Sequence, residues 1–96
     1  MDKKELEKAL EKIEEFGYEV VKHAEDSYSF LRGDKRLSIH KWDLVKTFKQ
    51  DVDLTSYEVY FKGCRAPGHT GYGNAFCVNF KEGMLLILGY MLLEAL

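Results

Sequence analysis

The first regular pattern of apolar positions along the chain is helical. Apolar residues near the N-terminus recur every three or four positions, which is the spacing of one helix face, and they are Leu6, Ala9, Leu10, Ile13 and Phe16. Asp2 followed by Glu5 is typical of a helix N-cap, and Gly17 stands where a left-handed C-terminal cap belongs. The pattern predicts an amphipathic first helix that covers a sheet, with its Glu and Lys side chains in solvent.

From Tyr18 onward the apolar residues alternate with polar ones, which is the pattern of strands with one buried face. Strands are predicted over residues 18–24, 28–32 and 36–42, joined by short polar turns. In the third strand Leu37 and Ile39 alternate with Ser38 and His40. The three strands predict an antiparallel meander, and a short helix or irregular connector is predicted from about residue 43 to 53.

A second hairpin is predicted from the segments TSYEVYFKG (55–63) and NAFCVNF (74–80). In the first segment Tyr57, Val59 and Phe61 share one face. In the second, alternation places Phe76, Val78 and Phe80 inward and Cys77 outward. If Phe61 lies opposite Phe80, Cys64 lies opposite Cys77 at the neck of a long loop, where a disulfide is the alternative to two reduced thiols.

The chain ends in EGMLLILGYMLLEAL, which has no polar position between Met84 and Leu93. A helix that is apolar all round needs cover all round, and a chain of 96 residues has little left to supply it. We therefore expect a second copy to pack against this helix around Gly89. The expected dimer interface is Met84, Ile87, Leu88, Met91 and Leu92. The alternative is a central helix covered by the sheet and the first helix of its own chain.

These elements predict one α+β domain over residues 1–96. It has an N-terminal helix, about five mostly antiparallel strands and an apolar C-terminal helix, with the helices packed on one sheet face. Apolar residues make up 46% and charged residues 31% of the chain, which is a globular balance. The charged start MDKKELEKAL is expected to be a helix and not a signal peptide. The ten-residue apolar run is too short to span a bilayer, so we expect a cytoplasmic protein with reduced thiols.

Charge is unevenly distributed along the chain. Residues 32–49 hold six bases and two acids, whereas the whole chain has a net charge of −2. A basic segment between acidic ones suits an anionic ligand or an acidic partner. The alternative interpretation is that these charges of both signs lie on solvated strand and helix faces. Basic residues are far sparser here than in a nucleic-acid-binding stripe.

The stretch CRAPGHTGYGNAFC (64–77) is the most unusual in composition. Its glycines leave backbone N–H groups able to converge on an anion, Arg65 can fork onto a phosphate or carboxylate, and Tyr72 can stack on a base. The predicted ligand-binding residues are Arg65, His69, Thr70, Gly71, Tyr72, Gly73 and Asn74 of this loop, with Arg36 and His40 of the basic segment. The alternative is a long loop whose glycines only permit tight turning.

The sequence gives less support to metal binding and to catalysis. Cys64 and Cys77 are too far apart for a structural zinc pair, so we predict no metal and no cofactor. A Cys–His nucleophile has no recognisable surroundings, which leaves His69 as a candidate acid–base residue only.

The sequence therefore favours a small non-enzymatic binding protein that acts as a homodimer. It would engage an anionic ligand, such as a nucleotide or nucleic acid, or a protein partner. The alternatives are a phosphoester-acting enzyme that uses His69, and a phage or viral inhibitor that blocks a host protein.

Overall fold

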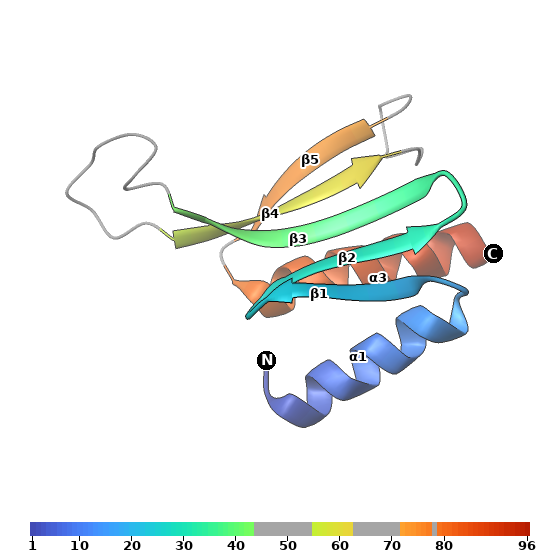
Figure 1. The fold of residues 1–96 in the computed structure, drawn as a ribbon, viewed down its shortest axis with the longest axis horizontal. Helices are drawn as coiled ribbons and strands as arrows, with labels where there is room; N and C mark the ends of the chain where they lie inside the picture. Colours follow the sequence, from blue (N-terminus) through green and yellow to red (C-terminus); the bar gives the residue numbers. More distant parts are fainter. Residues whose placement is uncertain (44–54, 63–71, 78) are drawn as a thin grey trace.

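Two helices pack against one face of an antiparallel sheet (Figure 1). The structure is a computed structural model that describes residues 1–43, 55–62, 72–77 and 79–96, with the backbone alone at 42–43, 55–56, 61–62 and 72–76. The predicted α+β class, with one helix before and one helix after the sheet, is confirmed. The predicted connector lies outside the described residues from position 44 onward.

Helix α1 (Lys3–Glu15) begins and ends where the sequence predicts. The Asp2 carboxylate accepts a hydrogen bond of 2.8 Å from the Glu5 backbone N–H, which satisfies one of the amides that a helix start leaves unpaired. Gly17 ends the helical turn with φ of +90°, a conformation that glycine adopts without strain. Ala9 and Ile13 are buried against the sheet side.

The sheet contains β1 (Glu19–Ala24), β2 (Ser27–Arg32), β3 (Lys35–Asp43), β4 (Thr55–Lys62) and β5 (Tyr72–Cys77). The strands lie side by side in chain order and each pair is antiparallel. Because side chains alternate along a strand, buried Leu37 and Ile39 face the helices, and Ser38 and His40 face the other way. We call these the inner and outer faces of the sheet.

Helix α3 (Phe80–Ala95) begins earlier than the sequence prediction allowed. The Asn79 side chain accepts a 2.8 Å hydrogen bond from the Glu82 N–H, a cap that turns the chain out of the sheet. The predicted strand over 74–80 is therefore wrong at its end.

The predicted register of this hairpin is also wrong, because Cys77 lies opposite Tyr57 and Phe61 lies opposite Gly73. Cys77 is buried in the core and not on the outward face that alternation predicted. The residue opposite Phe61 is Gly73 and not Phe80, a shift of seven positions, and a shift by an odd number moves every residue of a strand to the opposite face.

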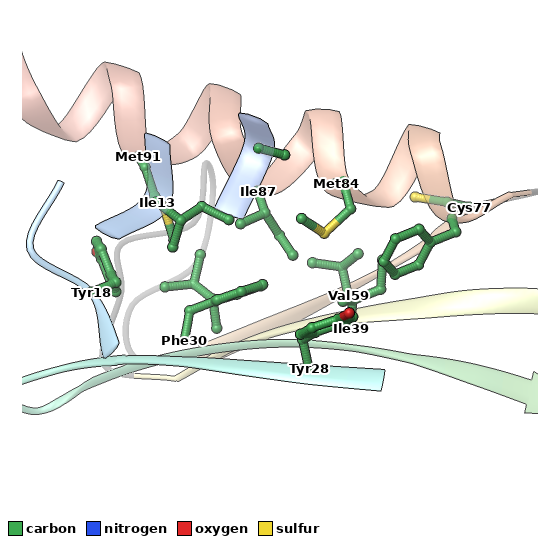
Figure 2. Packing of buried hydrophobic residues seen from close by; sticks show 13 residues of the cluster. Ile13, Tyr18, Tyr28, Phe30, Ile39, Val59, Cys77, Met84, Ile87 and Met91 are labelled. Atoms are coloured by element: carbon green, nitrogen blue, oxygen red, sulfur yellow. The ribbon is translucent and has the colours of Figure 1, made fainter. Parts of the chain in front are cut away.

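The core fills the space between the helices and the inner face (Figure 2). In Figure 2 the side chains of Met84, Ile87 and Met91 point from α3 toward the sheet. The largest fully buried side chains are Phe30, Ile13, Leu37, Ile39, Met84, Ile87, Met91 and Val59.

Candidate functional site

Helix α3 has two apolar faces in different surroundings. The face toward the sheet is buried and includes Phe80, Gly83, Met84, Ile87 and Met91. The opposite face is 41–93% exposed and consists of Leu85, Leu86, Leu92, Leu93 and Leu96. At 100° per residue these leucines lie within about 60° of Gly89 around the helix axis. We call the five leucines and Gly89 the leucine stripe.

The predicted dimer interface does not coincide with this stripe. Met84, Ile87 and Met91 are at most 1% exposed because they pack in the core of their own chain. Leu88 is half-buried at the edge of the core, and Leu92 is 53% exposed. The sequence argument missed Leu85, Leu86 and Leu93, since a helix that is apolar all round offers no contrast that separates an inner from an outer face.

Two glycines mark the two faces of α3. A Cβ atom at Gly83 would lie 3.3 Å from Val59 Cγ2 and would overlap Ile39 Cδ1, so the helix approaches the sheet closely there. A Cβ atom at Gly89 would have no described atom within 4 Å, apart from those of its two chain neighbours and of the backbone of its own helix. Glycine inside a helix is less stable than alanine by about 1 kcal/mol. Packing within the described chain explains Gly83 but does not explain Gly89.

A polar cluster around Glu94 fixes the rotation of α3 on the sheet. Glu94 accepts hydrogen bonds from Tyr18 Oη at 2.8 Å and Tyr90 Oη at 3.2 Å, and it pairs with Arg32 and Lys35. Burial alone would raise the pKa of Glu94, but the hydrogen bonds from Lys35 and Tyr18 and the nearby positive charges lower it below its ordinary value. Because this cluster holds one side of α3 against the sheet, the leucine stripe faces outward.

The same cluster uses part of the basic segment. Arg32 and Lys35 lie on the inner side of the sheet and share Glu94 as their partner, so one carboxylate within the chain offsets part of their charge. Arg36 belongs to the outer face, where its Nη2 lies 3.5 Å from Ser29 Oγ. Fewer bases than the sequence suggests are therefore available to a ligand.

The outer face of the sheet carries polar contacts between strands. His23 Nε2 lies 2.7 Å from Ser29 Oγ, and Ser29 is only 3% exposed beneath its neighbours. His40 Nε2 lies 3.2 Å from a carboxylate oxygen of Glu58 on the adjacent strand. His40, a predicted ligand residue, is therefore already paired with a carboxylate.

The register brings Arg36 of the basic segment to the strand ends that flank residues 63–71. Arg36 pairs with Lys62, the last residue of β4, and Lys62 pairs with Tyr72, the first residue of β5. Tyr72, Gly73 and Asn74 were predicted in the loop but lie in β5, where Gly73 and Asn74 are opposite Phe61 and Tyr60.

The remaining predicted ligand residues, Arg65, His69, Thr70 and Gly71, lie outside the described residues. His40 pairs with Glu58, four positions farther along β3 from Arg36. Arg36 thus lies at the strand ends that flank residues 63–71, and His40 does not.

Cys77 has the chemistry of a core residue. Burial, together with the nearby Glu82 carboxylate, raises the pKa of its thiol, and the thiolate is the form that acts as a nucleophile. It is a free cysteine among the described residues, while Cys64 lies outside them. In the described part of the chain, no group of three His, Cys, Asp or Glu residues is arranged to hold a metal ion.

A cleft of about 430 Å³ lies between the start of α1 and the β1–β2 turn. Leu6, Leu10 and Phe80 supply apolar walls. Charged residues of both signs line the rest, and they are Asp2, Lys3, Glu7, Lys22, Glu25 and Asp26. The mixed charges give this cleft no preference for a ligand of one sign.

No protein-family model, no curated protein and no solved structure matches this chain. No helix in the described ranges is long and apolar enough to cross a membrane. The leucine stripe and the strand ends near Arg36 are the features of the described chain that bear on its function.

Proposed function

We propose that the protein is a non-enzymatic binding protein that acts as a homodimer through the leucine stripe of α3. The observation that carries this proposal is the exposure of Leu85, Leu92 and Leu93, which are 56%, 53% and 70% exposed on one helix face. Soluble monomers rarely expose a contiguous apolar patch of this kind, and such patches mark interaction sites. The proposed interface shares only Leu92 with the one that the sequence predicted, because Met84, Ile87 and Met91 are buried.

A second copy fits the stripe better than a lipid surface does. Helices that lie in a membrane interface carry Lys and Arg along the polar flank of the apolar face. Here Glu82 continues the stripe at the start of α3, and the lysine beside it, Lys81, pairs with Glu5 at 2.7 Å. An anionic membrane would repel the Glu82 carboxylate, whereas a second stripe would cover the leucines and leave Glu82 at the rim.

Sedimentation equilibrium tests the homodimer. The wild-type protein is expected to show twice the chain mass of 11.1 kDa at micromolar concentration. Leu92→Lys is expected to raise the dissociation constant at least about tenfold, because it places a charge in an apolar interface. Ala95→Lys is the matched control, since Ala95 is exposed on the same helix but outside the stripe. A wild-type protein that is monomeric at all concentrations would refute the proposal.

An anionic ligand is the second part of the proposed function. It is supported by the alignment of Arg36 with Lys62 and Tyr72 at the strand ends that flank residues 63–71. Arg36 is exposed on the outer face, where no described helix covers the sheet. An arginine at that position can bind a phosphate group through two parallel hydrogen bonds.

Calorimetric titration with inorganic tripolyphosphate and with ATP tests this part. Arg36→Gln is expected to weaken binding about fivefold or more, and affinity is expected to fall as salt rises. Lys41→Gln is the control, because Lys41 is exposed on the same strand but alternates to the other face. An Arg36→Gln protein that binds as well as the Lys41→Gln protein would contradict the assignment.

The two alternatives give different results. Turnover of a phosphoester that His69→Ala abolishes would favour the enzyme. Tight binding to a host protein that is insensitive to salt and to Arg36→Gln would favour an inhibitor with an apolar interface.

A further inference from the structure

The unexplained glycine of the leucine stripe indicates how two copies would meet. Gly89 lies at the centre of the exposed face, with Leu85 and Leu86 on one side and Leu92 and Leu93 on the other. The distance between two packed helices depends on the side chains at the contact, so a glycine there allows the helix axes to approach closely. Close approach of another helix would account for a residue that otherwise destabilises α3.

Resting on the proposed homodimer, we propose that two α3 helices pack antiparallel about a two-fold axis that passes by Gly89. In this arrangement a residue that is n positions before Gly89 meets the residue n positions after it in the partner. Leu85 meets Leu93 of the partner subunit, and Leu86 meets Leu92 of the partner subunit. The stripe is self-complementary in this direction, as a two-fold interface requires.

Charge favours the antiparallel direction over the parallel one. A parallel pair in register would place Glu82 beside Glu82 of the partner subunit, and it would align the two helix dipoles. The antiparallel pair places Glu82 at the rim beside Leu96 of the partner subunit. No pair of like charges then meets along the stripe.

This arrangement also places the candidate anion sites. The C-terminal end of α3 is tied through Glu94 to Arg32 and Lys35, next to Arg36 and the strand ends that flank residues 63–71. In an antiparallel dimer, the C-terminal ends of the two α3 helices lie at opposite ends of the interface. The ligand sites would be separate, whereas a parallel dimer would place them together.

Pairs of complementary charged variants distinguish the directions. Leu85→Lys, Leu85→Glu and Leu93→Glu are purified separately and mixed in two combinations, and native mass spectrometry counts the mixed dimers. Positions 85 and 93 are both more than half exposed, so the single variants are expected to fold, and circular dichroism checks this.

Antiparallel packing predicts that Leu85→Lys and Leu93→Glu form mixed dimers at least about tenfold more abundant than either variant's own dimers, since opposite charges then meet. Parallel packing predicts the same preference for Leu85→Lys with Leu85→Glu, and that result would overturn the inference. A dimeric wild type with no preference in either mixture would also overturn it, but would leave the homodimer standing. A monomeric wild type would instead refute the proposed function.

A second measurement does not depend on charge. Gly89→Ala and Gly89→Leu are expected to raise the dissociation constant in that order, by at least about tenfold for leucine, because each added atom pushes the helices apart. Dimers of unchanged affinity in both variants would overturn the position of the axis at Gly89.

Discussion

The inner and outer faces of α3 are both apolar but have different surroundings. Met84, Ile87 and Met91 fill the core, and Leu85, Leu92 and Leu93 face solvent. Hydrophobicity therefore does not decide which side of this helix packs on the sheet. Gly83, which permits close approach to Ile39, and Glu94, which binds the β2–β3 end, set the rotation of the helix. The outer side is then left for another molecule.

The largest difference in the free energy of unfolding is expected between substitutions of buried and of exposed residues of α3. Ile87→Ala is expected to lower the free energy of unfolding by about 2–5 kcal/mol, because it leaves a cavity in the core. Leu85→Ala is expected to change it by less than about 0.5 kcal/mol. Both changes are made in the Leu92→Lys background, which the proposed interface predicts to be monomeric. Urea denaturation measures both. Equal losses would show that the outer leucines are as enclosed as the inner ones.

The two glycines of α3 are expected to respond differently to substitution by alanine, with the next largest change in stability. Gly83→Ala is expected to destabilise the protein by about 1–3 kcal/mol, since the added methyl group displaces Ile39 or shifts the helix from the sheet. Gly89→Ala in the same monomeric background is expected to stabilise it by up to about 1 kcal/mol through helix propensity. Thermal unfolding in a monomeric background supplies the measurement. Opposite signs would show that only Gly83 is closely packed, and a loss of stability at both positions would contradict this difference between the faces.

The Glu94 cluster is expected to give a somewhat smaller, pH-dependent effect. Glu94→Gln removes a charge that accepts several hydrogen bonds, and a loss of about 1–2 kcal/mol is expected at pH 7. Because the folded pKa of Glu94 is lowered from its ordinary value of 4.5, its contribution is present above that pH and is lost as the pH falls through the lowered value.

Denaturation at a series of pH values between 3 and 7 checks this effect. Wild type should lose stability toward acid more steeply than Glu94→Gln. Parallel curves for the two proteins would show that Glu94 does not fix α3 electrostatically.

The smallest effect is expected at the junction of the two helices. Lys81 and Glu5 form an ion pair with side chains that are 50% and 41% exposed, and such pairs contribute little to stability. Lys81→Gln is expected to leave the melting temperature unchanged in moderate salt. A clear drop would indicate that α1 contributes to holding α3 in its rotation.

Sequence reasoning predicted the elements of the fold better than their relative positions. Asp2, Glu5 and Gly17 carry local capping signals, and Leu37 and Ile39 alternate with polar residues, so α1 and β3 were predictable. The end of β5 was not, because the Asn79 cap competes with an equally plausible strand through Phe80.

The candidate site was predictable only in part. The sequence indicated that α3 needs cover from outside, but it had no polar residue to mark which side is covered. That information lies in contacts between distant parts of the chain, such as Glu94 with Arg32. Arg36 was predicted, and the register shows why it is the better candidate than His40, which pairs with Glu58.

The order of the sheet has a consequence for how the protein folds. Each strand pairs with its neighbours in sequence, so hairpins can form from nearby residues with a low cost of loop closure. The Tyr18–Glu94 and Arg32–Glu94 contacts join residues 76 and 62 positions apart. These contacts should therefore form after the hairpins, when α3 docks on the assembled sheet. Until α3 docks, the hydrophobic residues of its two faces are equally exposed, and the choice between them is made in that last step.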